Sequence, residues 1–234
     1  MGKFAKRSYQ KEWMDDLEVD GEILKQTLTE LRTINRFLGG NHVTTSGIQK
    51  LTSKNHQKSY SIADIGCGGG DMLKVLARWG KKMGLYAEFI GIDGNPHTIE
   101  AAKENLRDFP SVSLQHQNVF DPAFTQESVD IITCTLFTHH FTDEELIAMF
   151  RAFYTKANIG IVINDLHRHP LAYHSISWLT RLFSKSPMVK NDAPLSVQRS
   201  FKKPELVRIL REAGISNFEI RWFWAFRWRI VIHK

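Results

Sequence analysis

The chain has 234 residues, of which 42% are hydrophobic, and this length is enough for one α/β domain with a large core. No apolar run reaches the ~18 residues that a membrane-spanning helix needs, so we expect no transmembrane segment. The two cysteines, Cys67 and Cys134, are too few for a disulfide framework or a structural zinc site. Because the N-terminus also lacks the apolar core of a signal peptide, the composition favours a cytoplasmic protein.

The formal net charge of +6 is concentrated in one part of the chain. Residues 166–203 contain seven lysines and arginines and a single acid, Asp192, so their positive excess equals that of the whole chain. A local basic surface can attract nucleic acid, and it also suits an anionic or membrane-associated small molecule. We expect the charges that follow the apolar residues 171–179 to face outward, around the entrance to a substrate pocket.

The first 58 residues predict a helical cap. Leucine and isoleucine recur there at intervals of three and four residues, which is typical of an amphipathic helix, and the pattern ends at Gly39 and Gly40. The apolar positions are Leu24, Leu28, Leu31, Ile34 and Leu38. Residues 41–58 are polar and predict a second helix or an ordered loop that leads into the first strand.

A cluster of glycines follows the first predicted strand. Residues 62–65 are apolar, Gly66, Gly68 and Gly70 come next, and residues 71–77 have a helical pattern. Glycine allows positive φ and leaves no Cβ between the backbone and a ligand. A ligand can therefore lie against this turn, between the end of the strand and the N-terminus of the helix.

The second predicted strand, residues 88–93, ends in an acid. The carboxylate of Asp93 is suitably placed to accept hydrogen bonds from ribose hydroxyls, so the sequence predicts a nucleoside ligand. A dinucleotide fingerprint would place a third glycine at position 71, where this chain has Asp71. Asp64, just before the glycines, is unfavourable beside a pyrophosphate and suits a ligand that carries an amino group.

Three further strands are predicted at residues 112–116, 128–134 and 159–165, with helices between them. This alternation demands a mainly parallel sheet with helices on both faces, in which ligands bind beyond the carboxyl ends of the strands. A helix and a loop are expected over residues 166–203, as a substrate lid inserted after the fifth strand. The chain then predicts a helix from Pro204 and an antiparallel pair of strands, whose alternating tryptophans we expect on one buried face.

The ends of the fourth and fifth predicted strands carry the candidates for acid–base chemistry. His139 and His140 follow the fourth strand, and Asp165 and His167 follow the fifth. Histidine suits the role of a general base, and we favour His140 and His139 for it. Together with His167 and His169 these histidines could form a metal cluster, but no metal-binding motif is present and we expect no metal site.

Two stretches of this sequence resemble motifs of a known family. D-I-G-C-G-G-G-D at residues 64–71 and G-I-D-G-N-P at residues 91–96 resemble motifs I and II of the class I S-adenosylmethionine-dependent methyltransferases. The resemblance implies a Rossmann-like, doubly wound, mostly parallel seven-stranded α/β sheet with an antiparallel C-terminal strand. Residues 59–234 would form the methyltransferase domain, and residues 1–58 would cover the cofactor and the substrate.

The resemblance also implies S-adenosylmethionine as cofactor, with Asp64 toward its amino group and Asp93 on its ribose. The residues that it places at the cofactor are Asp64, Gly66, Cys67, Gly68, Asp93, Gly94, Asn118, Val119 and Cys134. Asn118 stands where the family usually has an acid that binds the adenine amino group. Its side-chain carbonyl can accept the same hydrogen bond, while the backbone N–H of Val119 could serve a ring nitrogen.

Within the superfamily, residues 31–40, 164–168 and 200–214 resemble small bacterial quinone, phenol and polyketide O-methyltransferases. We therefore expect methyl transfer to a hydroxyl of an aromatic or polyketide-like small molecule, which could be anionic or hydrophobic. The alternatives are an RNA or protein methyltransferase and a non-catalytic cofactor-binding module. Enzymes that methylate base amino groups usually carry N-P-P-[YF] or D-P-P-Y after the fourth strand, where this chain has C-T-L-F. We therefore expect no nucleic-acid partner, and the sequence leaves the oligomeric state open.

Overall fold

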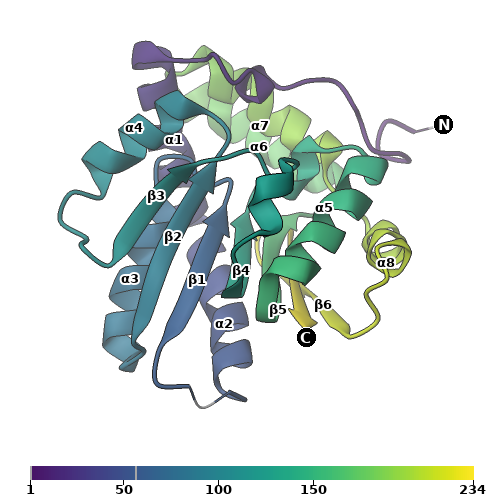
Figure 1. The fold of residues 1–234 in the computed structure, drawn as a ribbon. Helices are drawn as coiled ribbons and strands as arrows, with labels where there is room; N and C mark the ends of the chain where they lie inside the picture. Colours follow the sequence, from purple (N-terminus) through teal and green to yellow (C-terminus); the bar gives the residue numbers. More distant parts are fainter. Residues whose placement is uncertain (1, 56) are drawn as a thin grey trace.

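The computed structural model describes residues 2–55 and 57–234, which form a seven-stranded sheet with helices around it (Figure 1). The strand order is β3–β2–β1–β4–β5–β7–β6; the first five strands are parallel, and β7 runs antiparallel to both of its neighbours. The strands are β1 (Tyr60–Ile65), β2 (Ala87–Asp93), β3 (Val112–His116), β4 (Val129–Thr135), β5 (Ala157–Leu166), β6 (Phe218–Phe223) and β7 (Arg227–His233). The predicted mostly parallel, doubly wound sheet with an antiparallel C-terminal strand is therefore confirmed.

Helices cover both faces of the sheet and its carboxyl edge (Figure 1). One face packs against α2, α3 and α4, and the other packs against α5 and α8. Three more helices, α1, α6 and α7, lie across the carboxyl edge. The helices are α1 (Gly21–Phe37), α2 (Gly40–Thr52), α3 (Asp71–Met83), α4 (Pro96–Asn105), α5 (Asp143–Lys156), α6 (Pro170–Phe183), α7 (Pro187–Arg199) and α8 (Lys203–Glu212).

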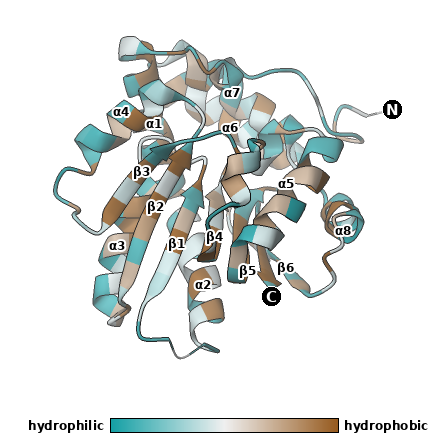
Figure 2. Cartoon of the chain, viewed as in Figure 1, coloured by the Kyte–Doolittle hydropathy of each residue, from teal (hydrophilic) through white to brown (hydrophobic). Residues whose placement is uncertain are grey.

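Two hydrophobic cores, one on each face of the sheet, hold these layers together. Leu51, Leu73 and Leu76 belong to the core under α2 and α3, and Phe150 and Phe153 of α5 belong to the other. Figure 2 shows the hydrophobic residues along the strands and on single faces of the covering helices. Because a parallel sheet is buried on both faces, its strands are nearly continuous apolar runs, and this is why they could be predicted from the sequence.

The second half of the basic segment is a helix and not the expected loop. Residues 187–199 form α7, which begins where Ser186 Oγ accepts a hydrogen bond from Val189 N (3.2 Å) and where Pro187 occupies the first helical position. Val189 and Leu195 lie on the buried side of this helix. Ser186 and Pro187, which indicated a loop, are in fact the N-cap and the first residue of this helix.

The predicted antiparallel C-terminal pair is present as β6 and β7, but its tryptophans do not share one buried face. Trp228 is buried, and its Nε1 donates a hydrogen bond to the carbonyl of Phe201 (3.0 Å). Trp222 and Trp224 are exposed, at 45% and 72%. The expectation was wrong because Trp222 lies in β6, the edge strand, and Trp224 lies in the turn between β6 and β7.

Two basic residues of this segment are buried, and one of them, Arg199, is among those that we expected to face outward. Arg168 forms an ion pair with Glu205, and its Nε donates to the backbone carbonyl of Phe4 (3.2 Å). Arg199 pairs with Asp15. These contacts neutralise part of the local basic excess inside the protein, and they hold the N-terminal segment against the rest of the molecule.

Cys67 and Cys134 are buried, free thiols, and burial raises the pKa of both well above its ordinary value. Buried thiols of this kind act as small apolar side chains. In the described part of the chain, none of the helices has the length and apolar character needed to cross a membrane.

We predict that Arg168→Met lowers the free energy of unfolding by about 3 kcal/mol, because it leaves Glu205 and backbone carbonyls without their buried partner. The matched control is Arg208→Met, which removes an exposed guanidinium that pairs with Asp143 and Glu212. The control should cost less than ~1 kcal/mol. Urea denaturation of both variants measures the difference, and equal effects would contradict the structural role of Arg168.

Candidate functional site

A cavity of about 380 Å³ opens at the carboxyl ends of β1, β4 and β5. The glycine turn after β1 lines one side, and α1, α6 and α7 line the others with apolar side chains. Leu28, Ile176 and Val197 are examples, one from each of these helices. The turn between β6 and β7 completes the wall. The cavity lies where a doubly wound sheet is expected to bind its ligands.

The glycine turn is tightly packed and holds the carboxylate of Asp93. Gly66 and Gly68 both have positive φ, and a Cβ on Gly66 would lie 2.1 Å from the ring of Phe137. The backbone N–H of Gly68 donates to Asp93 Oδ2 (2.9 Å), and that of Asn95 donates to Oδ1 (2.9 Å). These two bonds fix the acid at the end of β2, and its oxygens keep lone pairs for further donors.

Asp64 is a buried acid without a counter-ion on the cavity wall. It is 2% exposed, and its Oδ1 has no hydrogen-bond partner among the described residues. Burial, and then the nearby charge of Asp93, raise the pKa of Asp64 to about 8. A buried carboxyl that lacks a partner is suited to a ligand that brings a positive charge, such as an amino group.

The nine residues predicted at the cofactor divide into three groups. Asp64, Gly66, Cys67 and Gly68 line the main cavity, and Asp93 is bonded to them through Gly68. Gly94 and Asn118 line an adjacent polar hollow at the ends of β2 and β3. The side chains of Val119 and Cys134 are packed in the hydrophobic core.

Asn118 is exposed, and its Oδ1 already accepts a hydrogen bond from the backbone N–H of Phe120 (3.0 Å). The two neighbouring hollows suit an extended ligand with a charged amino end and a nucleoside end. We propose that such a ligand lies with its amino group toward Asp64, its ribose on Asp93 and its base toward Asn118. The orphaned carboxyl of Asp64 is the observation that best supports this orientation.

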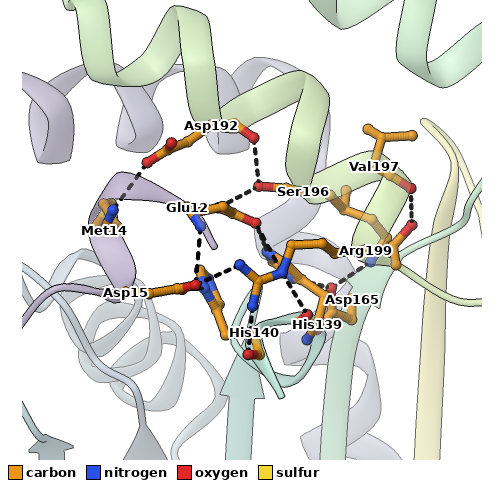
Figure 3. Close-up of polar contacts among 12 residues, drawn as sticks. Glu12, Met14, Asp15, His139, His140, Asp165, Asp192, Ser196, Val197 and Arg199 are labelled. Atoms are coloured by element: carbon orange, nitrogen blue, oxygen red, sulfur yellow. Dashed lines mark hydrogen bonds and ion pairs between the residues drawn. The ribbon is translucent and has the colours of Figure 1, made fainter. Parts of the chain in front are cut away.

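A second group of charged side chains meets at the same cavity (Figure 3). His139 Nδ1 lies 2.7 Å from Asp165 Oδ1, and its Nε2 lies 3.7 Å from Glu12 Oε1. His140 Nδ1 lies 2.5 Å from Asp15 Oδ1. The two imidazole rings stack with their centroids 4.3 Å apart. Each histidine is therefore oriented by a carboxylate that comes from a different part of the chain.

The two carboxylates that orient the histidines are strongly acidic. Burial alone would raise the pKa of Asp15, but hydrogen bonds from His140 and Arg199 outweigh it and lower this pKa to about 2. Burial acts in the same way on Asp165, and there the charge and hydrogen bond of His139 hold the pKa well below its usual range. Both groups are therefore ionised at neutral pH.

Glu12 behaves differently from these two acids. It is 5% exposed, burial raises its pKa to about 7, and its Oε1 has no hydrogen-bond partner among the described residues. Its other oxygen accepts a hydrogen bond from Ser196 Oγ (2.8 Å). Glu12 therefore gains and loses a proton near neutral pH, directly beside the Nε2 atom of His139.

Glu12 and the two stacked histidines each place one ligand atom within 4.8 Å of the others, a spacing that could hold a metal ion. His167 and His169, the other histidines considered from the sequence, contact each other instead, with ring centroids 5.5 Å apart. The guanidinium Nε of Arg199 lies 3.6 Å from Glu12 Oε1, so a positive charge already occupies the neighbourhood of this carboxyl. We therefore keep the prediction that the chemistry uses no metal.

Sequence reasoning missed Glu12, Asp15 and Arg199. The two acids lie in a short polar segment without a recognised motif, and Arg199 ends a helix that was expected to be a loop. The local signal is the three-residue spacing of the acids, since Asp15 Oδ2 accepts a hydrogen bond from the backbone N–H of Glu12 (3.0 Å). That signal predicts a helical turn and says nothing about the histidines more than a hundred residues away.

Comparison with known proteins identifies a methyltransferase domain in this chain. Residues 62–159, which include the glycine turn, Asp93 and both histidines, match the family model described as a methyltransferase domain. A solved structure of magnesium protoporphyrin IX methyltransferase from Synechocystis PCC 6803, with S-adenosylmethionine bound, has the same fold, with 15% identity, a TM-score of 0.54, and coverage of 94% of this chain and 89% of that one. The chain is an S-adenosylmethionine-dependent methyltransferase with the class I fold. S-adenosylmethionine is its cofactor.

Relatives of this methyltransferase act on different kinds of acceptor. A ubiquinone biosynthesis O-methyltransferase from Xanthomonas euvesicatoria is 28% identical over 175 residues, which cover 72% of this chain and 67% of the relative. A ribosomal protein L11 methyltransferase from Thermosipho africanus is 34% identical over 107 residues, which cover 45% of this chain and 38% of the relative. The structure of an O-methyltransferase family protein from Burkholderia thailandensis has a TM-score of 0.71 at 13% identity, over 97% of this chain and 65% of that one.

We predict that binding of S-adenosylmethionine releases close to one proton at pH 7. Free Asp64, with a pKa of about 8, is mostly protonated at this pH and must ionise beside the ammonium group of the cofactor. Affinity should therefore increase as pH rises toward 8 and level off above it. Calorimetry in buffers of different ionisation enthalpy measures the release, and Asp64→Asn should abolish it. Binding of the cofactor to the wild type without proton release would contradict the role of Asp64.

Asp93→Ala should weaken the binding of S-adenosylmethionine by about 10- to 150-fold, because the ribose loses a charged hydrogen-bond acceptor. Asp108→Ala, which changes an exposed acid, is the control and should leave the affinity unchanged. Titration calorimetry at fixed pH measures both constants. Unchanged cofactor affinity in Asp93→Ala would remove this residue from the binding site.

Proposed function

We propose that the enzyme transfers the methyl group of S-adenosylmethionine to a hydroxyl of a small aromatic or polyketide-like acceptor in the cytoplasm. The observation that carries the proposal is the Asp15–His140 pair, whose histidine lines the cavity that also contains the glycine turn. A cofactor on the glycine turn and an acceptor beside His140 would then share one enclosed space. The apolar side chains of α1, α6 and α7 suit the ring of such an acceptor.

His140 is the better of the two histidines for the role of base. Its side chain is 22% exposed, and Asp15 binds its Nδ1, which leaves Nε2 without a protein partner among the described residues. His139 is only 3% exposed and lies between Asp165 and Glu12. We therefore assign His140 the proton transfer and His139 a positioning role, in which it stacks on the ring of His140.

Methyl transfer from a sulfonium needs an in-line approach and an activated nucleophile. A phenol has a pKa near 10, so removal of its proton during the attack raises the rate at neutral pH. In the proposed step the hydroxyl oxygen forms a bond to the methyl carbon as the carbon–sulfur bond breaks, and the proton moves to His140 Nε2. Asp15 orients His140 and stabilises the imidazolium that forms. The products are the methyl ether and S-adenosylhomocysteine.

A small-molecule acceptor agrees better with the comparisons than a protein acceptor does. The ubiquinone-pathway relative matches 72% of this chain, whereas the match to the L11 methyltransferase covers 45%. We propose that residues 1–58 act as a cap and that residues 166–203, seen here as α6 and α7, close the acceptor side. Both segments contribute to the cavity wall, and this supports a site shaped for a small molecule.

We predict that His140→Ala lowers kcat by about 10²-fold or more while the affinity for S-adenosylmethionine is largely kept. Asp15→Asn should cause a smaller loss, because the histidine remains but loses its orienting charge. His139→Ala is the comparison and should mainly lower the melting temperature, since this ring is buried between two acids. Turnover, cofactor affinity and melting temperature are measured on all three variants.

The acceptor class is tested by a screen of the purified enzyme against phenolic acids, phenols, total RNA and a protein fraction. Methylation of phenolic hydroxyls supports the proposal, and methylation of RNA or protein alone overturns it. A His140→Ala variant that is stable, binds the cofactor and keeps full activity would remove His140 from the mechanism.

A further inference from the structure

Arg227 is a buried cation on the wall of the same cavity. It is the first residue of β7, pairs in register with Leu166 of β5 and Phe223 of β6, and is 1% exposed. Its Nη1 donates a hydrogen bond to Asn164 Oδ1 (3.3 Å), while its Nε has no hydrogen-bond partner among the described residues. Among the residues that the structure describes, the guanidinium therefore has a neutral amide as its hydrogen-bond partner and pairs with no carboxylate.

The other buried arginines of the described chain are all paired with acids. Arg7 binds Asp143, Arg168 binds Glu205, Arg199 binds Asp15, and Arg229 binds Glu219. Asp165, the acid whose charge acts on Arg227, is already bonded to Thr138, His139 and Leu166. Arg227 is therefore the buried arginine of the described chain that has no acid as its partner.

An unpaired charge in a protein interior is strongly unfavourable unless something compensates it. Burial lowers the pKa of Arg227 to about 10, which still leaves the group protonated at neutral pH. The side chain cannot avoid the cost by losing its proton, and Asp165, whose charge acts on it, is bonded to other groups. A carboxylate supplied by a ligand would lower this cost. The free Nε–H, on a residue that lines the cavity, is available to donate to that ligand.

A second unpartnered polar atom lies in the same corner of the cavity. Asn35 Oδ1 is buried without a hydrogen-bond partner, and it also lines the cavity. Asn35 Oδ1 and Arg227 Cζ both lie within 3 Å of the position that a Cβ on Gly40 would occupy, so both side chains use the space that glycine leaves at position 40. The corner therefore offers one charged donor and one acceptor to a bound molecule.

We propose that Arg227 binds a carboxylate of the acceptor, so that the substrates are hydroxylated aromatic carboxylic acids. The inference rests on the proposed function, because it places the acceptor between Arg227 and His140 in one cavity of about 380 Å³. The cofactor already has an assigned place for its amino group at Asp64, on the glycine-turn side of this cavity. The cofactor carries a carboxylate too, and the experiment has to separate the two sources.

The acceptor arm compares 3,4-dihydroxybenzoate with its methyl ester, which keeps the ring and the hydroxyls and lacks the charge. Wild type should methylate the acid with a kcat/KM at least about 10-fold above that of the ester, and Arg227→Met should bring this ratio near one. Arg229→Met is the matched control, because it removes a buried arginine two residues further along the same strand that is already paired with Glu219. The control should keep the ratio.

The cofactor arm compares the affinities for S-adenosylmethionine and for its decarboxylated analogue by calorimetry. The preference for the carboxylated cofactor should be the same in wild type and in Arg227→Met. If the preference disappears in the variant, Arg227 binds the cofactor and the proposal is overturned. The proposal is also overturned if the acid-to-ester ratio survives in Arg227→Met, and in that case methyl transfer to a phenol still stands.

Two further measurements distinguish the carboxylate site from a purely structural role of Arg227 and from the proposed function. Melting temperature should stay level or rise in Arg227→Met, because an uncompensated charge is removed, and it should fall in Arg229→Met; a residue with only a structural role would make both fall. If neither phenolic compound is methylated, binding of 3,4-dihydroxybenzoate in the presence of S-adenosylhomocysteine decides. Binding that Arg227→Met abolishes supports the carboxylate site without the proposed function, and no binding to wild type overturns the site.

Discussion

The ion pair between Arg199 and Asp15 is the interaction on which the arrangement of the site depends. Arg199 ends α7, and its guanidinium binds Asp15 Oδ2 (2.5 Å) and the backbone carbonyls of Gln10 and His140. One buried cation thus joins the N-terminal segment, α7 and the turn after β4. Together with Asp192, whose carboxylate accepts hydrogen bonds from the backbone N–H groups of Trp13 and Met14, this pair holds the segment so that Asp15 meets His140. The chemistry of the site therefore depends on contacts between distant parts of the chain.

The cavity contains one acidic and one basic buried side chain that the protein does not pair. Asp64 faces it from the glycine turn and Arg227 faces it from β7. The other buried arginines of the described chain are paired with acids of the protein, as Arg168 is with Glu205. Unpaired groups lower the stability of the free protein, and they become favourable contacts when ligands supply the missing charge. Their positions therefore indicate which end of the cavity suits a cation and which suits an anion.

The parts of this molecule that could be predicted from the sequence depend on local patterns. The apolar strands, the glycine turn and Asp93 lie within about thirty residues, and their spacing alone determines that they meet at one end of the sheet. Candidate histidines were found for the same reason, because the loops after parallel strands share one edge. The C-terminal tryptophans were misjudged because exposure depends on which strand lies at the edge of the sheet.

The rest could not be predicted because it depends on contacts across the whole chain. Glu12 and Asp15 lie beside the histidines because both form ion pairs with Arg199 of α7, which is far away in the sequence. Arg227 looked like one of several arginines among aromatic residues, and only burial without an acid sets it apart. Among the predicted cofactor residues, Val119 and Cys134 point their side chains into the core, which a motif alone does not reveal.

The central claim is that cofactor and acceptor occupy one cavity with His140 at the reacting hydroxyl. It is tested most directly by a crystal structure of the enzyme with S-adenosylhomocysteine and a phenolic acid bound together. We predict the cofactor amino group at Asp64 and the acceptor hydroxyl about 3 Å from His140 Nε2, on the side of the sulfur that the methyl group faces. An acceptor hydroxyl that lies away from both histidines, or an acceptor bound outside this cavity, would contradict the account.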